Sequence, residues 1–444
     1  MKRLVQSSKH DFIHILFGFI TLSMLVAAFC MPDRAEMLTG FKALLTSPCK
    51  AATNAFAVGG YAGTFFSGAL VCLICTLLYC LPGASASAPS VLGFLLTMGF
   101  TFWGVTVLNM LFGILGVLLY CAVKKQAPGK QANAMLFSTA LSPLYAELLL
   151  RYPGESVQGF NWVGLAFAVA VGIVVGFLVP ASLSHSPKTH KGFSLYSAAL
   201  TLGMISFVMY AILYKVPGIT SPDDSFSNDV VSPVIYNVFS ISVFVICIIV
   251  SLLMGTKPKD YWKLMRHSGH GVDFADAFGN GAFLMNVGVY GLFIVGYYNL
   301  INLAGTGVKF NAVALGCVFC MLAGCCSGSH PRNVWPCMLG YAIASFGMQA
   351  LIGESYSLTI NSQTIVIGLC FCSALSPICG SYGWILGAVA SIFHYFLVSC
   401  VPALHGKFLL YNGGFTACLV CVFLIPVFEA FFKTKEERKA AKCK

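Results

Sequence analysis

The chain has 444 residues, of which 58% are hydrophobic and only 9% are charged, whereas soluble domains carry about 25% charged residues. This composition excludes an ordinary soluble protein, and the long apolar runs without strand-like alternation predict an all-α polytopic membrane protein in contact with the lipid bilayer. The net charge of +11 does not indicate a nucleic-acid partner, because the basic residues stand in short loops and tails, where they act as topology signals.

The 19 cysteines stand mostly inside apolar segments, so we interpret them as small apolar helix residues. They form neither a zinc-ligand pattern nor a secreted disulfide framework. The sequence also lacks the metalloprotease, nucleophile-elbow and P-loop motifs. We therefore expect no metal, no cofactor and no enzymatic activity.

Apolar segments follow one another along the chain, separated by short polar loops. Residues 12–31 come after the basic start "MKR" and are long enough to span a bilayer, so we expect a retained first helix rather than a cleaved signal peptide. The twelve predicted segments are 12–31, 54–80, 91–122, 133–150, 161–183, 193–214, 230–254, 276–303, 311–350, 364–380, 384–402 and 408–432.

The last six segments repeat the first six in order and spacing, and a tryptophan opens the fifth segment of each half. Such ordered self-similarity predicts a duplicated architecture. The matched stretches are "NAFAVGG" (54–60) with "DAFGNGA" (276–282), "TALSP" (139–143) with "SALSP" (373–377), and "HKGFSLYSAA" (190–199) with "HGKFLLYNGG" (405–414). The predicted units are a first repeat at 1–217, an acidic extracytoplasmic linker at 218–229, a second repeat at 230–432 and a basic cytoplasmic tail at 433–444.

The third segment of each half, 91–122 and 311–350, is too long for one crossing, which needs about 20 residues. Each has a break near its middle, "TFWGVTVLN" (101–109) in the first half and "SGSHPRN" (327–333) in the second, so we predict a re-entrant helical hairpin in each. Each half then crosses the membrane five times, and the halves are inverted. With the amino terminus inside, the cytoplasmic loops hold 18 of the 26 Lys and Arg residues, as the positive-inside tendency requires.

Two alternatives to this topology stay open. Long bent helices could replace the hairpins, although that arrangement would place the basic loop "KKQAPGK" (124–130) outside. Segments 364–380 and 384–402 could also form a hairpin instead of two crossings.

The second break, "SGSHPRN", is the strongest candidate site. Irregular backbone inside a membrane persists only where it is buried in protein or lines a wet cavity, and broken helices of inverted repeats place substrate sites near the midplane. A helix that begins at Pro331 would present free N–H donors, and the Arg332 guanidinium would hold a carboxylate bidentately. An ion pair of Arg332 with Glu147 or Glu429, or an interfacial position, is the alternative. The candidate substrate-binding residues of this break are Ser327, Ser329, His330, Arg332 and Asn333.

The other repeated motifs add further candidates. The "YNGG" and "YSAA" helix starts and the helix-breaking "ALSP" turns occupy matching positions in the two halves, which is typical of a transport pathway. Asn109 is the uncharged counterpart of the second break. These added substrate-binding residues are Asn109, Ser142, Ser197, Ser376, Tyr411 and Asn412. Close helix packing, with Asn412 as a bridge, is the alternative role for the last motif.

Two acidic residues are candidates for coupling transport to a proton or a sodium ion. Asp276 stands near a predicted helix start, and Glu147 follows the first "ALSP" turn. N-capping is the alternative role for Asp276, and an interfacial position beside Arg151 is the alternative for Glu147. His330 could relay protons near neutral pH, although a hydrogen-bonded core histidine is the commoner case.

The stretches "HPRNVWPCMLG" (330–340), "SALSPICGSYGW" (373–384) and "LHGKFLLYNGGF" (404–415) together resemble an uncharacterised bacterial family of multipass membrane proteins, the domain-of-unknown-function family 1576. The resemblance implies a bacterial inner-membrane location and supplies no function. The last stretch is also faintly similar to the "HGYN" signature of urea transporters, which are inverted repeats with re-entrant helices. Here extra residues separate His405 from Tyr411 and Asn412, so no urea-site residue is carried over.

These observations together predict a secondary transporter of a small, anionic organic solute, with a midplane site between the re-entrant tips. The alternatives are a channel for a small neutral solute and a structural membrane protein without transport activity. We expect a bacterial inner-membrane location with both termini in the cytoplasm. The sequence leaves homo-oligomerisation open.

Overall fold

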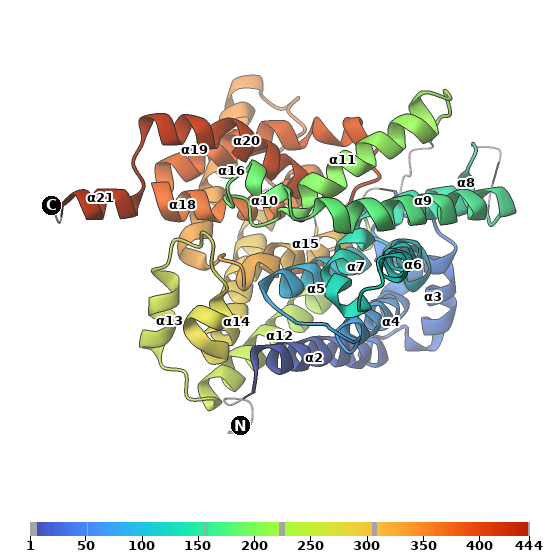
Figure 1. The fold of residues 1–444 in the computed structure, drawn as a ribbon, viewed down its shortest axis with the longest axis horizontal. Coiled ribbons are helices and arrows are strands. Elements are labelled where there is room, and N and C mark those ends of the chain that lie inside the picture. The colour runs from blue at the N-terminus through green and yellow to red at the C-terminus, as the bar shows by residue number, and fades with distance from the viewer. Residues whose placement is uncertain are drawn as a thin grey trace.

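The computed structural model describes residues 7–50, 52–154, 157, 159–221, 227–303 and 309–442, and within them every regular element is a helix (Figure 1). Nine of the described helices are long and apolar enough to cross a membrane. Large apolar side chains such as Val238 and Leu253 lie more than half exposed on their surfaces, as lipid contact requires. The prediction of an all-α, multipass membrane protein is therefore confirmed.

The elements follow the predicted order in both halves. The first half contains α2 (Lys9–Cys30), η1 (Arg34–Glu36), α3 (Met37–Leu45), α4 (Ala55–Leu78), α5 (Ala88–Thr101), α6 (Val107–Val123), η2 (Pro128–Gln131), α7 (Ala132–Ser138), η3 (Thr139–Leu141), α8 (Ser142–Arg151), α9 (Trp162–Ser182), α10 (Ser186–Thr189), α11 (Ala198–Tyr210) and η4 (Ala211–Lys215). The second half contains α12 (Pro233–Leu253), α13 (Pro258–Met265), α14 (Phe274–Asn302), α15 (Ala312–Leu322), η5 (Ala323–Cys325), α16 (Pro331–Ile352), α17 (Gln363–Cys372), η6 (Ser373–Leu375), α18 (Ser376–Tyr382), α19 (Trp384–Val398), η7 (Val401–His405), α20 (Asn412–Phe431) and α21 (Lys435–Lys442).

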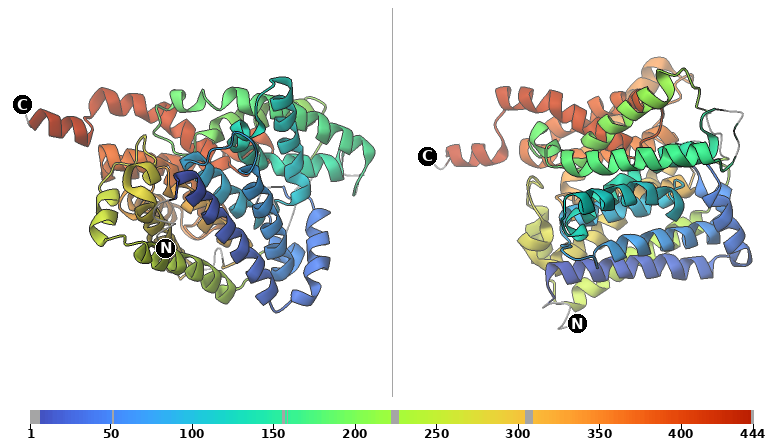
Figure 2. Two further views of the ribbon diagram at one scale, coloured as in Figure 1. Left: turned by 60° about the horizontal axis from the view of Figure 1, so that its bottom comes forward. Right: turned by 45° about the vertical axis from the view of Figure 1, so that its right-hand side comes forward.

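Four short helices lie where the sequence predicted loops or tail: α3, α10, α13 and α21. The central part of the acidic linker, residues 222–226, lies outside the described residues. Figure 2 shows the long helices packed side by side, with α21 extending from one end of the bundle. We call the end of the bundle that carries Lys9 the N-face and the other end the opposite face.

Each long third segment starts and ends at the same end of the bundle. At the N-face, Gly129 N donates a hydrogen bond to Pro82 O at 3.0 Å, which joins the loop before α5 to the loop after α6. At the opposite face, Phe310 before α15 and Asn361 after α16 line one small cavity. These contacts are the ones that two re-entrant hairpins of opposite direction would make.

The two breaks have the same local structure. In the first, Gly104 has φ +100°, a left-handed conformation that favours glycine. Thr106 and Asn109 form a capping box at the start of α6, and Asn109 Nδ2 donates to Gly104 O at 3.0 Å. The second break repeats each feature with Gly328 (φ +140°), a His330–Asn333 capping box, and an Asn333 Nδ2 to Gly328 O bond of 2.9 Å.

The second helix of each half caps the third segment of the other half. Asn54, the N-cap of α4, accepts a hydrogen bond from Ala312 N at the start of α15 at 3.3 Å. Asp273, the N-cap of α14, accepts one from Ala88 N at the start of α5 at 3.0 Å. Glycines with positive φ follow six residues later in both helices, at Gly60 and Gly279. Asn54 thus corresponds to Asp273, three residues earlier than the sequence match suggested.

The arrangement of the two ends generates a topology prediction. The loops around Lys124 and Glu354 belong to the N-face and to the opposite face, so they should lie on different sides of the membrane. Lys124→Cys and Glu354→Cys should react with an impermeant thiol reagent from different sides of sealed vesicles. Each is placed in a background that lacks Cys443, which is outside the described residues, and Cys30, Cys80 and Cys400, which are the exposed cysteines among them. Labelling of both from one side would contradict this fold.

Candidate functional site

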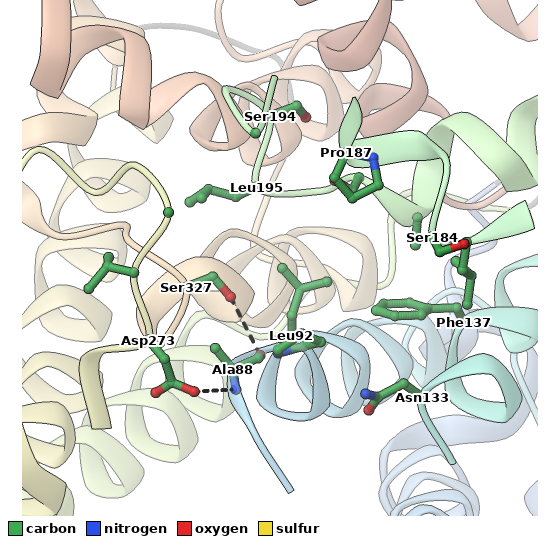
Figure 3. Close-up of a pocket in the computed structure, with 17 residues that line it drawn as sticks. Ala88, Leu92, Asn133, Phe137, Ser184, Pro187, Ser194, Leu195, Asp273 and Ser327 are labelled. Carbon is green, nitrogen blue, oxygen red and sulfur yellow. Dashed lines mark hydrogen bonds between the residues drawn. The ribbon is translucent and has the colours of Figure 1, made fainter. Parts of the chain in front are cut away.

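A cavity of about 480 Å³ lies at the N-face between α5, α7 and the segment that leads into α11 (Figure 3). Figure 3 shows Ala88 and Leu92 of α5 on one side of it and Ser194 and Leu195 on the other. We call this cavity the N-face vestibule. The polar side chains that line it are Asn133, Ser184, Ser194, Ser197, Asp273 and Ser327.

A second cavity, of about 250 Å³, lies at the opposite face between the residues before α4, the start of α17 and the segment that leads into α20. At its edge the Gln363 amide donates to the carbonyl oxygen of Ala52 at 3.4 Å. We call this cavity the opposite-face vestibule. The polar side chains that line it are Gln363, Thr364, His405, Lys407 and Asn412.

The two vestibules are built from the same motif of the two halves. Each motif is fixed to the "ALSP" turn of the other half by a backbone hydrogen bond. Leu195 N donates to Ala374 O at 3.1 Å. Leu410 N donates to Ala140 O at 3.0 Å. The matching lining pairs include Pro187 with Pro402, Leu195 with Leu410, and Ser197 with Asn412.

In each motif, a histidine forms a hydrogen bond with the polar side chain that stands seven residues later. His190 Nε2 lies 2.9 Å from Ser197 Oγ, and His405 Nε2 lies 2.8 Å from Asn412 Oδ1. Burial lowers the pKa of His190 to about 4 and also lowers the pKa of His405, so both rings are neutral at pH 7. Because His190 Nδ1 accepts from Ser194 N, Nε2 carries the proton and donates it to Ser197. The Ser197 hydroxyl can then donate its own hydrogen to a solute.

Buried aromatic rings separate the two vestibules. The Tyr196 and Tyr411 ring centroids are 5.7 Å apart, and Phe371 lies 5.5 Å from Tyr411. Neither Tyr196, Phe371 nor Tyr411 lines either cavity, so within the part of the chain that the structure describes these rings close the space between the vestibules. The members of this aromatic barrier, each at most 1% exposed, are Phe100, Trp103, Tyr196, Phe371 and Tyr411.

The two tyrosines of the barrier differ in one respect. Tyr196 Oη donates to Cys320 O at 2.8 Å and lies 3.1 Å from Ser373 Oγ. Tyr411 Oη, at the matching position, has no hydrogen-bond partner among the described residues. A buried hydroxyl without a partner costs about 1–3 kcal/mol. The Tyr196 hydroxyl avoids this cost, whereas the Tyr411 hydroxyl does not.

The two breaks lie at opposite ends of the bundle and do not face each other at a midplane. α5 and α15 pack side by side, with Trp103 Nε1 bonded to Val313 O at 3.0 Å at one end and Ser327 Oγ near Ala88 O at 3.4 Å at the other. Each break therefore lies beside the start of the third segment of the other half. The predicted site between two facing tips is not present.

Most of the predicted residues in the breaks and turns form structural hydrogen bonds. His330 is buried, with Nε2 3.0 Å from His267 O, and Ser329 Oγ lies 3.0 Å from Ser376 Oγ. Asn109 and Asn333 bond the glycine carbonyls of their own breaks. Ser142 is buried without a described partner. Of the predicted substrate-binding residues, only Ser197 and Ser327 line the N-face vestibule and Asn412 the opposite one.

The structure does not place the Arg332 side chain inside the protein. Arg332 is exposed at the N-face, and its guanidinium carbon lies 5.6 Å from the ring centroid of Trp262 on α13. α16 does begin at Pro331 as predicted. The expected desolvated guanidinium is absent because the break lies near the N-face, from which the long side chain reaches water.

The two ion-coupling candidates are both in ion pairs. Asp276 lies at the N-face, where Lys9 Nζ donates to its Oδ2 and, at 3.2 Å, to Asp273 Oδ2. Glu147 is 1% exposed, accepts from Arg151 Nε at 2.9 Å and from Ser221 Oγ at 2.9 Å, and lies outside both vestibules. Among the described residues, no group of three or more His, Cys, Asp or Glu side chains could hold a metal ion.

The Glu147–Arg151 pair generates a stability prediction. Glu147→Gln removes the charge that compensates a mostly buried guanidinium, so the free energy of unfolding should fall by about 3 kcal/mol. Thermal unfolding in detergent would measure the loss. Glu429→Gln is the matched control, because Glu429 pairs with the exposed Lys191, and it should change stability by less than about 1 kcal/mol. Equal effects of the two variants would show that burial of the first pair is unimportant.

Sequence reasoning missed several residues of the vestibules. Asp273 and Asn133 belong to helix starts that the structure brings together from different halves. His190 and His405 could have been identified, because both stand seven residues before the polar residue of the same repeated motif. Of the aromatic barrier, Tyr411 was predicted, and Tyr196 could have been identified from its matching position in the repeated motif. Phe100, Trp103 and Phe371 had no such signal, since they come from distant segments.

Comparison with known proteins yields one match. Residues 33–215 and 253–430 match a family described as "Protein of unknown function (DUF1576)". No curated protein and no solved structure matches the chain.

Proposed function

The chain belongs to the DUF1576 family of proteins of unknown function, and because membership supplies no activity, we propose from the geometry that the protein transports a small polar solute across a membrane. The observation that carries the proposal is the pair of vestibules at opposite faces, built from matching positions of the two halves. A non-transporting structural protein has no need for two such cavities.

We infer that the halves are inverted repeats, each with one re-entrant hairpin. The exchanged caps at Asn54 and Asp273 and the exchanged bonds at Leu195 and Leu410 are the contacts expected of an approximate two-fold axis in the membrane plane. Inverted repeats carry out alternating access by letting each half adopt the conformation of the other. Of the two vestibules, the N-face vestibule is the larger, at about 480 Å³ against about 250 Å³.

The closed aromatic barrier favours alternating access over a channel. In this mechanism the N-face vestibule closes while the opposite-face vestibule extends past Leu410. Tyr411 would then gain the hydrogen bonds that Tyr196 now makes, and Tyr196 would lose them. The matching acceptors in the first half are near Thr97 and Thr139, whose hydroxyls already lie 3.0 Å apart.

The barrier residues and the motif side chains nearest to them carry hydroxyl, amide and aromatic groups without formal charge. A site of this chemistry suits a solute with hydrogen-bonding groups and no net charge, because an unpaired charge would be costly there. The anionic solute predicted from Arg332 loses its main support, since that side chain is exposed at the surface.

An anionic solute remains the second candidate because of one observation. A separate cavity of about 530 Å³ adjoins the opposite-face vestibule through Pro402 and Lys407. Lys50, Lys215 and Lys407 line it. Positive charge at the mouth of a pathway raises the local concentration of anions.

We also propose that the N-face is cytoplasmic and that the protein lies in a bacterial inner membrane. The positive-inside tendency supports this orientation, because the loops and tail assigned to the cytoplasm hold 18 of the 26 Lys and Arg residues. We propose no enzymatic activity and no coupling ion.

Two variants that each remove a single hydroxyl test the mechanism without knowledge of the solute. Tyr196→Phe should destabilise the present form by about 1 kcal/mol and shift the equilibrium about fivefold toward the opposite-face-open form. Tyr411→Phe should leave the present form unchanged or favour it. Ser184→Cys and Thr364→Cys report access to the two vestibules through their rates of reaction with an impermeant thiol reagent.

The expected result is opposite changes in the two reporters. Tyr196→Phe should lower the reaction rate of Ser184→Cys and raise the reaction rate of Thr364→Cys. Tyr411→Phe should neither lower the rate of Ser184→Cys nor raise the rate of Thr364→Cys. Tyr145→Phe is the matched control, because Tyr145 Oη is also buried without a described partner but lies outside the barrier. If both barrier variants alter the two reporters in the same direction, or neither alters them, the alternating-access proposal fails.

A further inference from the structure

A group of cations gathers at the N-face where α13, α16 and α21 meet. We call it the basic cluster, and its members are Arg332, Lys435, Arg438 and Lys439. Lys435 lies close enough to the other three for their charges to repel its own. Arg332 lies over the Trp262 ring of α13. These like charges are held together by the fold, although mutual repulsion opposes their approach.

α21 is held in this place by the end of α18. Lys435 Nζ donates to Cys379 O at 3.4 Å, and Arg438 Nη2 donates to Tyr382 O at 3.0 Å. Cations are favoured at the C-terminal carbonyls of a helix because of its dipole. Arg438 Nε also donates to Thr434 O at 3.4 Å. The other N–H groups of the Lys435 and Arg438 side chains make no printed bond within the described residues, so they can bind a ligand.

No carboxylate among the described residues forms an ion pair with the basic cluster. The acidic residues nearby are fewer than the cations. Asp260 pairs with Lys263 at 3.8 Å, and α21 itself carries Glu436 and Glu437, of which Glu437 accepts from Thr434 N at 2.7 Å. Four cations against the two carboxylates of α21 leave the cluster with a net charge of +2.

Exposed tryptophans surround the cluster on the lipid side. Trp335, three residues after Arg332 on α16, stacks with Trp384 at 6.1 Å between ring centroids. Trp335 is 40% exposed, and Trp384 and Trp262 are each 52% exposed. Exposed indoles of a membrane protein lie at the level of the lipid headgroups. The cations beside them are thus at the depth of the lipid phosphates.

The cluster is not a requirement of the duplicated scaffold. Asn333 and Asn109 occupy the same place in the two breaks, so the first-half counterpart of Arg332 is Leu108. α21 likewise comes after the last repeated helix. The Arg332 charge therefore has no counterpart at the matching position of the first half.

We propose that the basic cluster binds the headgroup of an anionic phospholipid from the leaflet at the N-face. The Arg332 guanidinium would hold the phosphate bidentately, Lys435 and Arg438 would supply further charge, and the acyl chains would lie along Trp335 and Trp384. This proposal does not depend on what the protein transports.

Lipid binding to the full-length protein in detergent, followed by native mass spectrometry, tests the proposal. Phosphatidylglycerol should bind more tightly than phosphatidylcholine, and Arg332→Gln or Lys435→Gln should each weaken its binding about fivefold. Lys124→Gln is the matched control, since Lys124 lies at the same face outside the cluster, and it should leave affinity unchanged. Unfolding temperatures in lipid-free detergent check that the variants are folded.

Three results would overturn the proposal. Equal binding of the two lipids would show that headgroup charge is not recognised. An effect of Lys124→Gln as large as that of Arg332→Gln would indicate nonspecific attraction to the whole basic face. Displacement of phosphatidylglycerol by inorganic phosphate at equal concentration would make the cluster a site for a free anion rather than for a lipid.

Discussion

A helix that breaks inside a membrane exposes backbone N–H and C=O groups that lipid cannot satisfy, and this constraint governs the whole structure. Both third segments break at a glycine with positive φ, and both breaks satisfy their own backbone with an asparagine side chain. The starts of the same segments are satisfied by the other half, through Asn54 and Asp273. The vestibules lie beside these starts. The hydrogen bonds between the two halves therefore also position the candidate pathway.

The same interlocking explains why the barrier could move without the fold coming apart. Each motif that leads into a last helix is bonded to the turn of the other half, at Leu195 and at Leu410. Because the two bonds are equivalent, an exchange of conformations between the halves preserves the number of backbone hydrogen bonds. Under the proposed alternating access, the tyrosine hydroxyls of the barrier would exchange their bonded and unbonded states.

The helix order and the broken third segments could be predicted from the sequence, because long apolar runs depend on many residues at once. The position of the breaks along the membrane normal could not be predicted. Arg332 stands in the middle of a long apolar stretch, yet α16 begins near the N-face because α15 runs the length of α5 before the chain turns. Helix α13 also escaped prediction, since its charged sequence is typical of a loop. Ser197 and Asn412 were identified because a repeated motif marked them, whereas Asp273 depends on contacts between distant segments.

The exchanged caps have a consequence for how the protein is made. Asp273 follows Ala88 by 185 residues, so at a synthesis rate of about 5–20 residues per second the start of α5 waits about 10–40 s for its partner. During that interval Ser87 and Ser90 cap the start of α5 locally, but the Ala88 N–H lacks its bond to Asp273. The contact that joins the two halves at this point therefore forms only after Asp273 has been synthesised.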